Sequence, residues 1–139
     1  MTPGPFVIDT NVVVSGLLSM DSLSPPAKIL DGMLGGHFRY LLSAELLGEY
    51  REVLLRPRIR RRHGLSAEEI DLVLTDLTAN GIWLDFTSVA DKEGDEHIEA
   101  ILSIEPSAQL VTGDLRLANR LENSSRVLSP RDFLDLLSA

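Results

Sequence analysis

Short apolar runs alternate along the chain with longer segments in which apolar residues recur at helical spacing. The short runs, bounded by polar or turn-forming residues, predict strands at 5–8, 38–42, 82–86, 109–112 and 126–128. The longer segments predict helices at 24–34, 43–55, 66–79, 95–104, 114–121 and from 129 onward. Residues 10–18 fit a strand by their β-branched side chains and a helix by their place after a strand exit, so both readings stay open here.

The predicted helices carry recognisable end signals. Ser43 is placed to cap one helix and Pro57 to end it, while Ser66 and Glu69 have the spacing of a capping box. Strands that alternate with helices are typical of βαβ units, and they predict an α/β fold with a parallel sheet covered on both faces. No internal repeat or linker interrupts this order, so we expect one domain over residues 1–139.

Composition narrows the class of protein. The chain has 139 residues, of which 44% are hydrophobic and 24% charged, and these ordinary globular values exclude a disordered or collagen-like chain. It has no cysteine, which excludes disulfides, thiolate zinc sites, iron–sulfur clusters and cysteine nucleophiles. There is no basic leader, and no apolar run approaches the roughly 18 residues of a membrane span. We therefore expect a soluble, cytoplasmic protein with no membrane partner.

The charge is acidic overall but unevenly distributed. Lys and Arg number 13 against 21 Asp and Glu, a net charge of −8, which taken alone argues against nucleic-acid binding. Nearly half of the cations, however, lie between Arg51 and Arg62. The arginine run, Arg56–Arg62, is interpreted either as a solvated loop or as a contact for RNA phosphates or a protein partner. The candidate contact residues are Arg58, Arg60, Arg61 and Arg62.

Two carboxylates follow predicted strands directly. Asp9 comes after the first strand and Asp114 lies just beyond the fourth. Because ligands of open parallel sheets bind at the carboxyl ends of the strands, we expect both side chains at the same edge. Each could equally be a helix cap or turn residue, which is a common use of aspartate.

Helical periodicity adds two more carboxylates. At ~100° per residue, Glu49 and Asp95 fall beside the inward faces of their helices, whereas Glu45 points further toward solvent. The neighbouring cations Arg51 and Arg116 project away from these faces by the same arithmetic. Carboxylates at core-facing edges are costly unless they are paired or bind a metal. The four acids therefore predict an oxygen-ligand site suited to Mg²⁺ or Mn²⁺.

Other side chains are weaker candidates. The histidines are scattered along the chain and are expected at the surface or partly packed rather than as metal ligands. Trp83 lies in a predicted strand, where packing in the core is a more frequent role than stacking on a base. No glycine-rich phosphate loop accompanies Gly113.

Four sequence blocks resemble the PIN-domain family, and within it the bacterial VapC-like toxin components of toxin–antitoxin systems. The blocks are VIDTNVVVSGLL, LLSAELLGEYREVLLRPRI, DEHIEAI and LVTGDLRL. The resemblance extends over nearly the whole chain, through SPRDFLDLL. It implies a parallel sheet of about five strands flanked by helices and an Mg²⁺- or Mn²⁺-dependent endoribonuclease. It also implies an RNA substrate and a protein antitoxin, and it leaves a homodimer open.

The resemblance assigns four acidic residues and two polar neighbours to the site: Asp9, Glu49, Asp95 and Asp114, with Asn11 and Thr112 beside them. It implies that the three aspartates bind metal, directly or through water. Glu49 would orient or deprotonate the attacking water, or complete the metal shell. Arg116 stands where relatives often carry a further Asp, and Gly94 and His97 replace a common acid and aromatic. These departures leave the number of metal ions open.

Three functions were weighed on this basis. The intact acids favour a metal-dependent endoribonuclease, acting as the toxin of a toxin–antitoxin pair. The alternative is a catalytically silent PIN-like module that binds RNA or protein. An Asp-nucleophile phosphatase or receiver domain using Asp9 is disfavoured, because the first strand lacks a DxD motif and neither Lys28 nor Lys92 follows a late strand.

Overall fold

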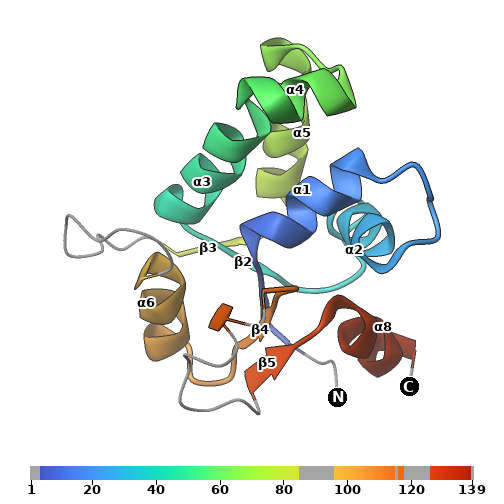
Figure 1. Cartoon of the computed structure of the whole chain (residues 1–139). Coiled ribbons are helices and arrows are strands. Elements are labelled where there is room, and N and C mark those ends of the chain that lie inside the picture. The colour runs from blue at the N-terminus through green and yellow to red at the C-terminus, as the bar shows by residue number, and fades with distance from the viewer. Residues whose placement is uncertain (1–3, 85–95, 115, 118–125, 139) are drawn as a thin grey trace.

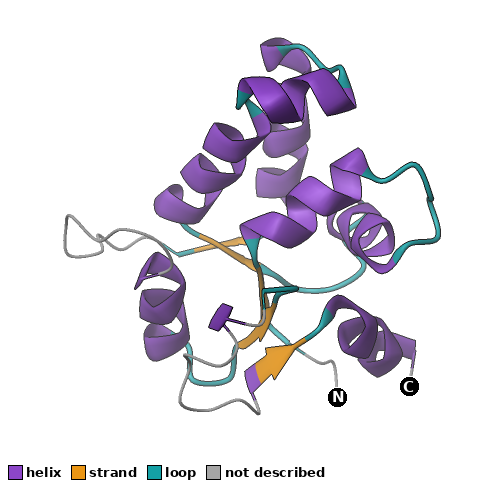
Figure 2. Ribbon diagram, viewed as in Figure 1, coloured by secondary structure: helices purple, strands orange, loops and turns teal. Residues whose placement is uncertain are grey.

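The computed structural model describes residues 4–84, 96–114, 116–117 and 126–138. Its strands are β1 (Phe6–Ile8), β2 (Leu41–Leu42), β3 (Ile82–Trp83), β4 (Gln109–Val111) and β5 (Val127–Leu128). Its helices are α1 (Thr10–Leu18), α2 (Pro25–Leu34), α3 (Ala44–Leu54), α4 (Pro57–His63), α5 (Ala67–Asn80), α6 (Glu96–Ile104) and α8 (Pro130–Ser138). Figure 1 shows their order, and Figure 2 shows helices flanking the central strands. The predicted α/β class is confirmed.

All pairs of described strands are parallel. β1, β4 and β5 form a three-stranded sheet in the order β1-β4-β5, and β2 and β3 form a second pair. A single bridge between Phe6 and Tyr40 joins the two sets. In this register, one row of facing residues crosses all the strands at their carboxyl ends: Trp83, Leu42, Ile8, Val111 and Leu128. The strand ends that precede the predicted acids are therefore aligned.

Strands β1 and β2 are buried because their apolar side chains pack into the core, whereas β3 is exposed at the edge. Phe6, Val7 and Ile8 of β1 are fully buried. Phe133 of α8 packs edge-on against Phe6 and Phe38, with ring centroids 4.6 and 4.9 Å apart. These ring contacts pack the last helix against the first strand.

The predicted helix caps are confirmed. Ser43 accepts the backbone N–H of Leu46 at 3.1 Å, and Ser66 and Glu69 form the complete capping box at the start of α5. Residues 10–18, for which a strand and a helix were both considered, form helix α1 with Asp9 as its N-cap. The β-branched side chains of α1 are accommodated because Val12, Val13 and Val14 are buried in the core.

The arginine run forms a helix rather than a loop, but none of its residues is buried, so the expected solvent exposure holds. Pro57 ends α3, as predicted, but it also begins helix α4, because proline is favoured in the first turn of a helix. The predicted strand 82–86 is seen as β3 with Leu84 beyond it, and its last two residues lie outside the described residues. Most of the predicted helix 114–121 also lies outside them. None of the described helices has both the length and the apolar character needed to cross a bilayer.

Candidate active site at the carboxyl edge of the sheet

Asp9 and Asp114 meet through one hydroxyl group. The backbone N–H of Asp9 donates to the carbonyl of Val111 at 2.9 Å, which continues the pairing of β1 with β4 past the strand ends. Thr112 follows β4, and its hydroxyl donates to Oδ2 of Asp9 at 2.7 Å. The Thr112 hydroxyl oxygen in turn accepts the backbone N–H of Asp114 at 2.9 Å. The predicted neighbourhood of Asp9 and Asp114 at one edge is therefore present.

The carboxylate of Asp9 is buried, with 5% of the residue exposed. Besides the Thr112 hydroxyl, its oxygens accept the backbone N–H of Thr10 at 2.8 Å and the side-chain amide of Asn11 at 3.0 Å. Three donors offset the cost of removing this carboxylate from water. Asp9 thus caps helix α1 and also presents a hydrogen-bonded carboxylate at the edge, so the structural and functional interpretations are compatible.

Glu49 is joined to the same group of residues from helix α3. It is half-buried, and the Thr10 hydroxyl donates to its Oε2. Thr10 therefore links two predicted site residues, since its backbone binds Asp9 and its side chain binds Glu49. Thr10 was not among the predicted site residues. The sequence feature that could have identified Thr10 is its hydroxyl group directly after Asp9, in the first turn of the helix that Asp9 caps.

Tyr50 holds α3 in place at the end of β1. Its hydroxyl donates to the carbonyl of Ile8, the residue before Asp9. Burial raises the pKa of the Tyr50 phenol well above its usual range, and the nearby charges of Asp9 and Glu49 raise it further. Tyr50 is thus a buried core residue whose hydrogen bond also sets where the neighbouring Glu49 lies.

Asp114 lies partly open to solvent and contacts a cation. Its Oδ1 accepts the backbone N–H groups of Arg116 at 2.9 Å and Leu117 at 3.4 Å, as a helix cap would. The Arg116 guanidinium lies 3.6 Å from the same oxygen, so Asp114 has a neighbouring cation even though the Arg116 side chain projects into solvent. The Arg116 side chain is 95% exposed, and solvent makes such a pair weak. Asp114 therefore keeps a solvent-facing carboxylate.

Two other expectations concerned residues of α3. Glu45 was expected to point toward solvent, but it is half-buried and its Oε2 is shielded from water. Arg51 turns to the other side of the helix, where it binds Asp71 through an Nε–Oδ1 contact of 2.8 Å. The Arg51 charge is thus committed to α5 rather than to the carboxylates.

The oxygen atoms of the described site residues are of the kind that bind hard cations such as Mg²⁺. Asp9, Glu49 and Asp114 supply carboxylate oxygens, and the hydroxyls of Thr10 and Thr112 connect them. Within the described ranges, no three Asp, Glu or His side chains form a group that could hold a metal ion. Asp95, the fourth predicted acid, lies outside the described residues. Its place in the site remains a prediction.

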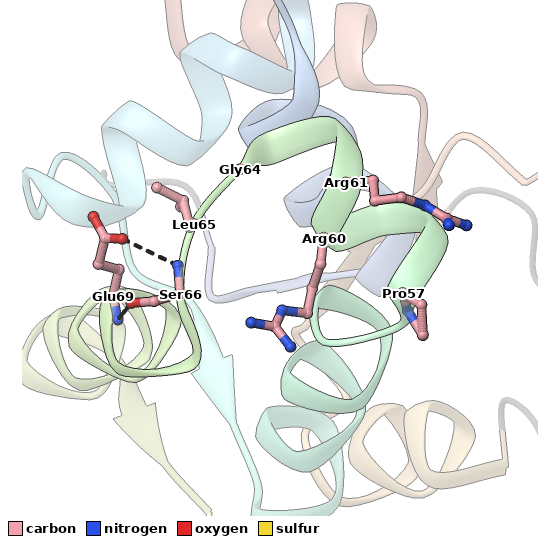
Figure 3. A pocket seen from close by; sticks show the side chains of 7 residues that line it. All are labelled: Pro57, Arg60, Arg61, Gly64, Leu65, Ser66 and Glu69. Atoms are coloured by element: carbon pink, nitrogen blue, oxygen red, sulfur yellow. Dashed lines mark hydrogen bonds between the residues drawn. The ribbon is translucent and has the colours of Figure 1, made fainter.

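The arginine side chains of helix α4 extend in different directions and line two separate cavities. Arg60 and Arg61 line a cavity of about 570 Å³, with Ser66 and Glu69 on its other wall. Figure 3 shows these two arginines extending in different directions from α4. Arg62 lines a separate cavity of about 290 Å³, beside the last turns of α1. Since Asp9 caps the opposite end of α1, Arg62 is about 13 Å along that helix from the carboxylates.

Trp83 is not a core residue. It is 47% exposed at the carboxyl end of β3, which is an edge strand among those described. The sequence run around it is apolar, but an edge strand has a neighbour on one side only, and local pattern does not reveal which strand is at the edge.

Comparison with known proteins bears on the whole arrangement. A family model described as PIN domain matches residues 5–116, which include β1, β4 and all four predicted acids. Neither the curated proteins nor the solved structures gave a match to the chain. Proteins of the matched family are generally nucleases that use divalent metal ions. By this match over most of its length, the chain belongs to the PIN-domain family.

Proposed function

We propose that this protein is an endoribonuclease that cleaves RNA phosphodiester bonds with Mg²⁺ or Mn²⁺, and that it is the toxin of a toxin–antitoxin pair. The nuclease character of its family supports the first part. The observation that carries the proposal is the shared Thr112 hydroxyl, which holds Asp9 and Asp114 together at the carboxyl edge. The toxin role rests on the sequence resemblance to VapC-like proteins.

In this proposal each acid has a distinct task. Asp9 and Asp114, with Asp95, hold the divalent ion directly or through water. When bound, the ion supplies positive charge to the phosphate and makes water more acidic. Glu49, held at Oε2 by Thr10, orients the attacking water or takes its proton. The water oxygen forms a bond to phosphorus, the bond to the leaving oxygen breaks, and that oxygen takes up a proton.

The net charge of −8 repels RNA at long range, so binding needs local positive charge. The arginine run on α4 is the densest group of cations in the sequence. We propose that it contacts RNA phosphates, with an antitoxin contact as the competing role. Because α1 connects Asp9 to the cavity lined by Arg62, one RNA strand could reach both.

The second candidate is a catalytically silent PIN-like module that binds RNA or protein. Two observations favour it: the contact of Arg116 with Asp114, and the lack of a three-ligand metal group within the part of the chain that is described. The two candidates differ in whether RNA is cut.

The deciding experiment is cleavage of end-labelled single-stranded RNA by the purified protein with Mg²⁺, with Mn²⁺ and with a chelator. We expect internal cuts only when a divalent ion is present. A parallel preparation of Asp9→Asn controls for contaminating nucleases. Equal cutting by both preparations would defeat the nuclease proposal, and RNA binding without cutting by the wild type would favour the silent module.

A further inference from the structure

A groove on the outer side of α3 has a lining unlike that of the carboxylate site. It has a volume of about 430 Å³ and lies between α3, α5 and the end of β3. Leu47 and Leu74 supply apolar surface, and Trp83 supplies an aromatic wall. The Arg51–Asp71 ion pair also lines it, and both side chains are about half exposed. The groove thus combines apolar and aromatic surface with hydrogen-bond donors and acceptors.

The groove extends to the same edge of the sheet as the carboxylates, because Trp83 lines it. Trp83 faces Leu42 in the β2–β3 pair, and the Phe6–Tyr40 bridge sets Leu42 level with Ile8. Trp83 is therefore in the row of strand ends that includes the residue before Asp9. Two strand spacings separate β3 from β1, a distance of about 10 Å. A single-stranded nucleic acid bound over about 4–16 nucleotides easily spans this distance.

Helix α3 contributes to both places. Glu49 contacts Thr10 on the carboxylate side, and its neighbour Gly48 lines the groove. A Cβ atom on Gly48 would meet no atom within 4 Å, so packing does not require glycine there. Glycine inside a helix costs roughly 1 kcal/mol relative to alanine. Gly48 thus leaves open space in the groove that Trp83 lines, as a planar ligand requires.

We propose that this groove binds an unpaired base of the RNA substrate, stacked on Trp83 and adjacent to the carboxylate site. The proposal rests on the proposed nuclease function and adds a binding subsite to it. Unpaired RNA bases are recognised by stacking on aromatic rings and by hydrogen bonds to their edges. Trp83 offers the first contact, and the Arg51–Asp71 pair offers the second. A groove of this volume falls within the range of small-ligand sites.

The test uses Trp83 as its own reporter, because it is the only tryptophan of the chain. Tryptophan fluorescence and the anisotropy of labelled RNA are followed while the full chain is titrated with a single-stranded RNA of about 12 nucleotides. One arm uses wild type in a chelator, and the other uses Asp9→Asn with Mg²⁺, so that the RNA stays intact. An abasic strand with the same ribose–phosphate backbone is the matched probe. Neither readout requires cleavage.

We expect Trp83 fluorescence to be quenched over the same RNA concentrations at which anisotropy rises, and much less by the abasic strand. Trp83→Leu should weaken RNA binding about tenfold or more, whereas Trp83→Phe, which keeps an aromatic face, should retain most of the affinity. Gly48→Ala should raise the melting temperature but weaken RNA binding. That combination separates a ligand contact from a purely structural position, and it does not depend on a destabilised variant.

RNA binding with unchanged Trp83 fluorescence, or equal binding by Trp83→Leu, would overturn the base subsite and leave the nuclease proposal standing. Fluorescence that changes with protein concentration and not with RNA would assign the groove to self-association instead. Absence of RNA binding in both arms would overturn the subsite together with the proposed function.

Discussion

The Thr112 hydroxyl lies 2.7 Å from Oδ2 of Asp9, although 103 positions separate the two residues in the sequence. The pairing of β1 with β4 brings them together, and Thr112 lies where β4 ends. Its oxygen also receives the backbone N–H of Asp114. One uncharged side chain therefore sets the relative positions of two predicted metal ligands.

Removing this hydroxyl should affect both stability and activity. Thr112→Val keeps the shape but leaves the buried Asp9 carboxylate with one donor fewer, a cost of about 1–3 kcal/mol in unfolding free energy. Cleavage should fall roughly 10–100-fold, as for other residues that orient metal ligands. Urea unfolding and single-turnover cleavage measure the two effects. Thr112→Ser is the control and should stay near wild type; a valine variant equal to it would remove Thr112 from the account.

Much of the fold was predictable because its signals are local. The serine caps of α2, α3 and α5 satisfy N–H groups within their own first turns, so their spacing in the sequence suffices. The carboxyl ends of β1 and β4 were predicted to within one residue, and parallel pairing then predicted that Asp9 and Asp114 share an edge. Pro57 was misread in part, because a proline that ends one helix can begin the next.

The hydrogen bonds of the site were less accessible from sequence. The Thr10–Glu49 contact spans 39 positions and depends on how α1 and α3 pack. The exposure of Trp83 depends on which strand lies at the edge of the sheet. Its alignment with the ends of the other strands follows only from the strand register. The Arg116 guanidinium lies 3.6 Å from Asp114 although its side chain is exposed, and helical periodicity did not predict this contact.

Stability should fall in alkaline solution because of the buried tyrosines. Burial raises the pKa of Tyr40 to about 12, and burial together with the charges of Asp9 and Glu49 raises the pKa of Tyr50 well above its usual range. Unfolded tyrosine ionises near pH ~10. Above that pH the unfolded chain has released protons that the folded chain keeps, so the free energy of unfolding decreases as pH rises. Below it, these groups add no pH dependence.

Urea unfolding between pH 9 and 12 tests this expectation. Tyr50 alone should contribute a decrease of about 1.4 kcal/mol per pH unit above pH ~10. Tyr50→Phe should start from lower stability, because the Ile8 carbonyl loses its donor, but should show a shallower decline. An unchanged slope in the variant would contradict the assignment to Tyr50.

Divalent ions should stabilise the folded protein if the carboxylates bind them. Ligand that binds only the folded state raises the melting temperature by mass action. We expect Mg²⁺ or Mn²⁺ to raise it for wild type and much less for Asp114→Asn. Asp76→Asn, an exposed position on α5, is the matched control and should respond like wild type. Identical responses in Asp114→Asn and wild type would count against Asp114 as a ligand.

The arginine run lines two separate cavities, one with Arg60 and Arg61 and the other with Arg62. Each lost phosphate contact should reduce the slope of log affinity against log salt by roughly 0.7 for single-stranded RNA. We expect the largest effect of a single change from Arg62→Ala, since Arg62 lies beside α1. Lys28→Ala on α2 is the control. If no slope changes but binding of a protein partner fails, the run serves the partner.

The most direct measurement is the single-turnover cleavage rate of Asp9→Asn and Asp114→Asn beside Asp76→Asn, with folding checked by circular dichroism. Asparagine caps a helix about as well as aspartate, so α1 should persist while the charge at position 9 is lost. We predict that both site variants remain folded and lose cleavage at least about 100-fold, while Asp76→Asn cuts RNA at the wild-type rate. Near-normal cleavage by folded Asp9→Asn and Asp114→Asn would contradict the account.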